Sequence, residues 1–131
     1  MKVSELDLRP DMLKALKKMG YEELTPVQEE TLKPILEGRD LIAMAETGSG
    51  KTAACAIPMV QRVNPELREI QGLVIVPTRE LALQYVDEIA RIAQFAPIEA
   101  FGVYGGFSMD IQKSKLAHGV HILVATPGRL I

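Results

Sequence analysis

The stretch that decides the fold is "AMAETGSGKTAA", from Ala43 to Ala54. It nearly matches the phosphate-binding loop pattern G-x-x-x-x-G-K-[ST], with Ala45 in place of the first glycine. Gly48 and Gly50 lack a Cβ, so the backbone can fold closely around phosphate. Lys51 can reach outer phosphates, and the Thr52 hydroxyl can bind Mg²⁺. The alternative is a glycine-rich turn that carries a surface lysine.

The segments around this loop alternate between short apolar runs and helical patterns. Apolar runs at 41–45, 73–77, 98–104 and 121–126 are expected to be strands, and helices are expected from Lys51, over 79–94 and over 108–116. This alternation predicts an α/β fold with a parallel sheet flanked by helices and right-handed crossovers. Cys55, in the small apolar helix after the loop, is expected to be a buried core thiol.

The first 38 residues are expected to be helical. Pro10 suits a first helical position and Gly20 a helix end. Thr25 followed by Pro26 and Gln28 is a capping box. We expect one structural domain, made of a helical region at 1–38 and a nucleotide-binding region at 39–131.

Gln28 has a second interpretation besides capping. Its amide offers an acceptor and a donor side by side, so it can accept from adenine N6 and donate to N7. Guanine presents two acceptors there and would lose one of these bonds. Both interpretations stay open at the level of the sequence.

Each apolar run is followed by a turn that suits an anion: "ETGSGKT", "PTREL", "GGFS" and "TPGR". Because ligands gather at the carboxyl ends of parallel strands, these turns are expected to share one edge of the sheet. His118 and His121 could suggest a metal pair, but Gly119 breaks a helix between them, so a loop and strand-start role is favoured.

The amino-acid composition limits the functions and the cellular location that the sequence indicates. The net charge is −2, aromatic residues are 5% and tryptophan is absent, so neither a basic patch nor a stacking platform for nucleic acid is indicated. The single cysteine fits a reducing compartment, and no run is long enough to span a membrane. We expect a cytosolic protein.

These motifs occur in the order found in one family. The chain resembles the N-terminal RecA-like half of DEAD-box ATP-dependent RNA helicases, from about Val3 to the last residue. "GYEELTPVQ" (20–28) is similar to their Q motif, "AETGSGKT" (45–52) to their motif I, in which alanine is normal, and "PTRELA" (77–82) to motif Ia. The glycine doublet is at 105–106, and "TPGR" (126–129) is similar to motif Ib.

The resemblance implies a role for each matching residue. Tyr21 and Gln28 would hold adenine. The loop would hold the phosphates of ATP through Ala45, Glu46, Thr47, Gly48, Ser49, Gly50, Lys51 and Thr52, with Lys51 and Thr52 catalytic and Thr52 a ligand of Mg²⁺. RNA would lie along Pro77, Thr78, Arg79, Gly105, Gly106, Thr126, Pro127, Gly128 and Arg129. Family members grip phosphates largely with backbone amides, so little base specificity is expected. Arg79 and Arg129 would otherwise form ordinary salt bridges, for example with Glu80 or Asp87.

Two features depart from the family pattern. Val3 stands where the family has an aromatic residue that packs on adenine. The printed sequence contains no Asp-Glu-Ala-Asp, whose carboxylates place Mg²⁺ and the attacking water in the family. We therefore expect an incomplete, truncated RecA-like region of a longer enzyme, inactive by itself and prone to self-association. The alternatives are another P-loop ATPase or kinase, and a non-catalytic RNA-binding protein.

Overall fold

The computed structural model describes residues 2–45, 48, 50–105, 109–117 and 119–130. Its elements follow the expected alternation, after a short 3-10 helix. In chain order they are η1 (Val3–Glu5), α1 (Pro10–Lys18), α2 (Pro26–Leu36), α3 (Lys51–Arg62), β1 (Gly72–Ile75), α4 (Arg79–Ile92), β2 (Ala100–Val103), α5 (Met109–Ala117), β3 (Ile122–Ala125) and α6 (Pro127–Leu130).

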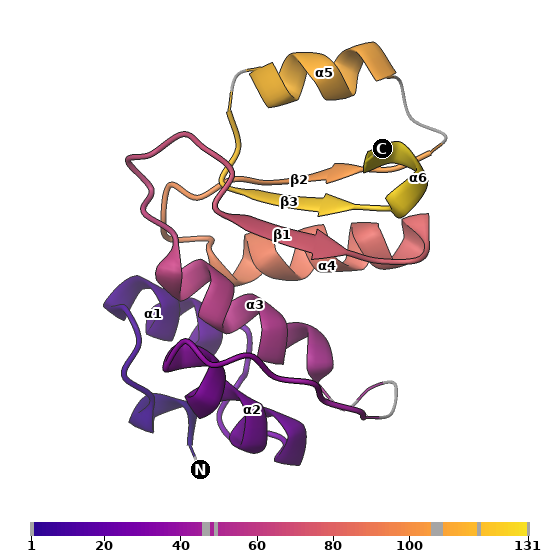
Figure 1. Ribbon diagram of the computed structural model, residues 1–131. Coiled ribbons are helices and arrows are strands. Elements are labelled where there is room, and N and C mark those ends of the chain that lie inside the picture. Colours follow the sequence, from indigo (N-terminus) through magenta and orange to yellow (C-terminus); the bar gives the residue numbers. More distant parts are fainter. Residues whose placement is uncertain (1, 46–47, 49, 106–108, 118, 131) are drawn as a thin grey trace.

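The described strands form one three-stranded parallel sheet in the order β1-β3-β2. The central strand β3 is buried along its whole length, as expected for a parallel strand covered on both faces. Helix α5 lies over one face of the sheet and α4 over the other, and the three arrowheads point to the same edge (Figure 1). The predicted parallel α/β fold is therefore confirmed, and the strand ends meet at a shared edge.

The expected strand at 41–45 is absent from this sheet, so that prediction is wrong. The segment has no regular structure, and Ile42 and Met44 are each 96% exposed. A strand needs a neighbour that satisfies its backbone N–H and C=O groups. The described sheet has two edge strands, β1 and β2; Leu73 and Ile75 of β1 are about half exposed, and 41–45 pairs with neither edge.

The N-terminal helices form as their capping signals predict. Pro10 begins α1, and Gly20 follows the helix with a φ of 86°. The capping box of α2 is complete, because both reciprocal hydrogen bonds of Thr25 and Gln28 are present. Helix α1 contacts α4, and α2 packs on α3.

One hydrophobic core joins the helical region to the sheet. Its buried side chains come from several elements and include Leu16, Leu32, Ile57, Ile89 and Val124. Within the described residues, no helix is long and apolar enough to cross a membrane. The core therefore fixes α2 and α3 relative to each other, which places Gln28 against the predicted nucleotide loop.

Candidate nucleotide-binding site

The loop before α3 has the backbone geometry of an anion site. Gly50 is the N-cap of α3 with a φ of 92°, and Gly48 has a φ of 84°, both in the left-handed region that favours glycine. Gly50 has no side chain to cap this helix end, so, within the part of the loop that the structure describes, the N–H groups of the first turn are available to an anion. Lys51 is exposed at the first helical position. The predicted site residues Glu46, Thr47 and Ser49 lie outside the described residues.

Gln28 connects helix α2 to this loop. Its side chain is buried, and its Nε2 donates to the carbonyl of Gly50 at 3.2 Å. Its Oε1 accepts from the backbone N–H of Thr25 at 3.0 Å, which is half of the capping box. A Cβ on Gly50 would lie 2.5 Å from the same Nε2, so this contact also requires glycine.

The amide of Gln28 keeps some of its hydrogen-bonding capacity. The two bonds use one N–H and one lone pair, and a primary amide has two of each. One donor and one acceptor are left for a ligand. The capping interpretation is therefore confirmed, while recognition of adenine stays a prediction.

Tyr21 lies apart from the loop. Its hydroxyl donates to Glu88 Oε1 at 2.5 Å, and burial together with this carboxylate raises its pKa to about 12. Tyr21 lines a cavity of about 560 Å³ with Val3, Leu13 and lysines of α1, and none of the described phosphate-loop residues lines it. The hydroxyl proton of Tyr21 is used by Glu88, so a contact with adenine would use the ring or a lone pair of the phenol oxygen.

Burial raises the pKa of Tyr85 on α4, and Cys55 of α3 adds to the rise, whereas Thr52 of α3 opposes it. The prediction of a buried Cys55 is wrong, because its thiol is exposed. The sequence analysis did not identify Tyr85. A signal was available: Tyr85 lies between Ala82 and Ile89 at helical spacing, on the stripe of α4 that packs against the core.

The predicted RNA-binding residues lie in turns at the carboxyl edge of the sheet. Backbone bonds connect adjacent strand ends there, from Val76 N–H to Ala125 and from Thr126 N–H to Val103. Thr78 caps α4 by accepting from Leu81 N–H at 3.2 Å. The set includes exposed Pro77, Thr78, Arg79, Gly105, Pro127 and Gly128, with Thr126 and Arg129 partly buried.

Two details complete this edge. Gly106 lies outside the described residues. Asp87, one of the salt-bridge partners considered for Arg79, pairs instead with Arg91 at 3.2 Å. The structure thus gathers the described motif residues at one edge, but it does not test their contact with RNA.

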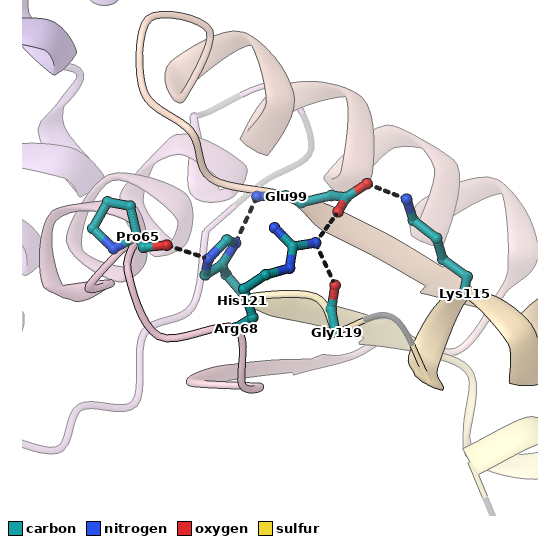
Figure 2. Close-up of polar contacts among 6 residues, drawn as sticks. All are labelled: Pro65, Arg68, Glu99, Lys115, Gly119 and His121. Atoms are coloured by element: carbon teal, nitrogen blue, oxygen red, sulfur yellow. Dashed lines mark hydrogen bonds and ion pairs between the residues drawn. The ribbon is translucent and has the colours of Figure 1, made fainter.

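His121 fixes the opposite end of the sheet, where β3 begins (Figure 2). Its Nδ1 accepts from Glu99 N–H at 2.9 Å, and its Nε2 donates to the carbonyl of Pro65 at 3.0 Å. The ring is fully buried. The structural role expected for His121 is therefore confirmed, whereas His118 lies outside the described residues.

An exposed ion cluster extends from this point. The carboxylate of Glu99 pairs with Lys115 and with Arg68, the latter at 3.1 Å, and Arg68 also donates to the carbonyl of Gly119 at 2.9 Å (Figure 2). The hydrogen bond from Lys115, supported by Arg68, holds the pKa of Glu99 below its usual value. These contacts connect the loop after α3 with the starts of β2 and β3, at the end of the sheet away from the motif turns.

Comparison with known proteins agrees with this arrangement. The family model described as DEAD/DEAH box helicase matches residues 25–131. The chain is 47% identical over 130 residues to the "ATP-dependent RNA helicase CshA" of Limosilactobacillus reuteri, covering 99% of this chain and 26% of that protein. It is 45% identical to the "DEAD-box ATP-dependent RNA helicase CshA" of Streptococcus pneumoniae, covering 100% and 25%. The chain thus spans about a quarter of the length of these curated relatives.

Solved structures give the same result. A DEAD box protein from Methanococcus jannaschii superimposes with a TM-score of 0.93 at 36% identity, covering 99% of this chain and 36% of that one. A hypothetical ATP-dependent RNA helicase from Sulfolobus tokodaii superimposes with a TM-score of 0.83 at 37% identity, covering 94% and 35%. Since the family model matches most of the chain, residues 25–131, the chain belongs to the DEAD/DEAH box helicase family.

Proposed function

We propose that the protein carrying this chain is an ATP-dependent RNA helicase, which couples ATP hydrolysis to the unwinding of RNA duplexes or the remodelling of RNA–protein complexes. The observation that carries the proposal is the helix end at Gly50. There an anion-suited turn, an exposed Lys51 and the amide of Gln28 come together.

The phosphates of ATP would bind the N–H groups of the first turn of α3. Gly50 offers these donors no side-chain cap, and Lys51 adds a positive charge beside them. Thr52 would hold Mg²⁺ through its hydroxyl; bound there, the ion neutralises charge that develops on the phosphates. Gln28 would recognise adenine with the N–H and the lone pair of its side-chain amide that its hydrogen bonds to Gly50 and Thr25 do not use.

RNA would lie along the turns that follow β1, β2 and β3. Backbone N–H groups at such turns bind phosphate and sugar without reading bases, which fits a chain of net charge −2. The proposal therefore includes little base specificity. It also places the protein in the cytoplasm, where its RNA substrates would be found.

The chain by itself is proposed to bind nucleotide without useful hydrolysis. Phosphoryl transfer needs groups that position the attacking nucleophile and the metal ion. Within the printed sequence no Asp-Glu-Ala-Asp supplies the carboxylates that the family uses for this.

RNA-stimulated ATP turnover measures these proposals directly. The intact protein should hydrolyse ATP faster when single-stranded RNA is added, and should prefer ATP to GTP. The purified 131-residue chain should show no turnover above background under the same conditions. If RNA does not increase ATP turnover by the intact protein, the helicase proposal is contradicted. Robust ATP turnover by the 131-residue chain would contradict the proposal that it is inactive.

A further inference from the structure

Gln112 is a buried glutamine that fastens helix α5 to the end of strand β2. Its side chain is 1% exposed, and its Nε2 donates to the carbonyl of Tyr104 at 3.1 Å. Tyr104 directly follows β2, and α5 lies over the face of the sheet beside it (Figure 1). Four residues further along α5, Leu116 packs against a small cluster of sheet side chains. Gln112 therefore lies on the inner face of the helix, where an apolar side chain is usual.

The amide of Gln112 is only partly satisfied. Its Oε1 is buried, and within the described residues it has no hydrogen-bond partner. A buried acceptor without a partner destabilises the folded state, and an apolar side chain of similar size would avoid that loss. The presence of glutamine is therefore better explained by what its bond to Tyr104 does to the chain that follows.

The bond with Tyr104 sets the direction of the next N–H group. The carbonyl of Tyr104 and the N–H of Gly105 belong to one planar trans peptide unit, in which the two groups point in opposite directions. Because the carbonyl is directed at Gln112 on α5, the Gly105 N–H is directed away from α5. Within the described residues this N–H has no hydrogen-bond acceptor, and Gly105 is exposed. It is thus an available donor at the carboxyl edge of the sheet.

The surroundings of Gly105 leave room for a ligand. A Cβ on Gly105 would meet nothing within 4 Å, and its φ lies outside the left-handed region, so the described part of the fold does not itself require glycine here. The absence of a side chain does let another backbone approach the N–H closely. The neighbouring turn is tied to the same strand end, since Thr126 N–H donates to the carbonyl of Val103 at 3.0 Å.

We propose that Gln112 is a positioning residue for RNA binding, which aims the Gly105 N–H at a phosphate or ribose oxygen of the bound strand. This inference rests on the proposed RNA-binding function and adds a residue that does not itself touch RNA. Backbone N–H groups bind the sugar-phosphate chain without reading bases, so Gln112 affects the affinity for RNA of any sequence.

Gln112→Met tests the inference in the intact protein, because methionine fills a similar volume and has no amide. ATP turnover is measured at saturating ATP and Mg²⁺ over a range of oligouridylate concentrations. The RNA concentration that gives half-maximal stimulation should rise about threefold to tenfold, the effect of one hydrogen bond. Turnover at saturating RNA, affinity for ATP without RNA and the midpoint of urea denaturation should stay close to those of wild type.

Gln94→Met is the matched control. The exposed amide of Gln94 also donates to a backbone carbonyl, that of Arg91 at 2.8 Å, but it lies beyond the end of α4 that is away from the motif turns. This variant should need the same RNA concentration for half-maximal stimulation as wild type.

Gln112→Leu is a second variant without the amide, and it should raise the required RNA concentration as Gln112→Met does. An unchanged RNA concentration in either folded variant would overturn the inference. So would a parallel loss of RNA stimulation, ATP affinity and stability, which indicates a general structural role, and so would the failure of both variants to fold.

The two levels of the proposal fail in different ways. If RNA does not stimulate ATP turnover by the wild-type protein, the proposed function is wrong and this inference falls with it. If RNA stimulates the wild-type protein and Gln112→Met responds identically, only the role of Gln112 is wrong.

Discussion

Replacing Gln28 with glutamate separates its two roles. Glutamate keeps an oxygen that can accept from Thr25 N–H, so half of the capping box survives. It loses the donor to Gly50, and it places a second acceptor about where Nε2 now lies, 3.2 Å from that carbonyl. The lost hydrogen bond is worth about 0.5–1.5 kcal/mol, and a buried acceptor without a partner costs about 1–3 kcal/mol.

We therefore expect Gln28→Glu to lower the free energy of unfolding by roughly 2–4 kcal/mol. The carbonyl of Gly50 keeps its bond from Ala54 N–H at 3.1 Å, so the helix itself should persist. Urea denaturation provides the measurement. Gln94→Glu is the matched control, because it removes a similar donor to a carbonyl on the surface, and it should change stability by no more than about 0.5 kcal/mol.

Nucleotide titration completes the test of Gln28. In the intact protein, affinity for ATP should fall by about 30-fold or more, since 1.4 kcal/mol corresponds to a factor of ten. Affinity for GTP should fall less, because only the distortion of the loop affects it. If the ratio of ATP to GTP affinity stays the same, Gln28 does not read adenine. If stability is also unchanged, its contact with Gly50 contributes nothing, and our reasoning is refuted.

Three further expectations concern stability and assembly. In urea denaturation, His121→Leu should lower the free energy of unfolding by about 2–5 kcal/mol, because Glu99 N–H and the Pro65 carbonyl lose their buried partner. The control Arg91→Ala, on an exposed ion pair, should lower it by at most about 1 kcal/mol. Equal losses of stability in the two variants would contradict the role of His121. Tyr21 should make stability fall as pH rises from 10 toward 12, because the tyrosine of the unfolded chain releases its proton near pH 10 and that of the folded chain keeps it to about pH 12. Across this range the denaturation midpoint should fall less steeply with pH in Tyr21→Phe than in wild type. Identical pH slopes in the two proteins would argue against the expectation. The purified 131-residue chain should self-associate at micromolar concentration through the open edge of β1. In sedimentation experiments, Ile75→Lys should reduce this self-association. A chain that sediments as a monomer and unfolds cooperatively would show that the exposed edge does not cause association.

Local signals predicted much of this fold. Pro10 and the Thr25–Gln28 capping box set helix starts through contacts within a few residues, so the sequence carries them directly. Gly48 and Gly50 adopt the positive φ that only glycine takes easily, which is why the phosphate loop was recognisable. The alternation of runs also predicted the parallel sheet, since connected parallel strands need crossovers.

Other features depend on contacts that a sequence pattern does not contain. The run at 41–45 is as apolar as a strand, but a strand also requires a paired neighbour, and 41–45 does not pair with the described sheet. Cys55 lies in an apolar helix, yet the face it occupies is set by how α3 packs on α4. The bonds of His121 to Glu99 and Pro65 join segments that are far apart in the chain.

The affinity of Lys51→Ala for ATP tests the central claim most directly. Lys51 is exposed beside the helix end at Gly50, so its removal should leave the fold intact and take away a charge-assisted contact with phosphate. Calorimetric titration of the intact protein should show a loss of roughly 2–4 kcal/mol, while Lys113→Ala, an exposed lysine on α5, should leave ATP binding unchanged. If Lys51→Ala binds and turns over ATP as wild type does, the loop from Gly48 to Thr52 is not the nucleotide site.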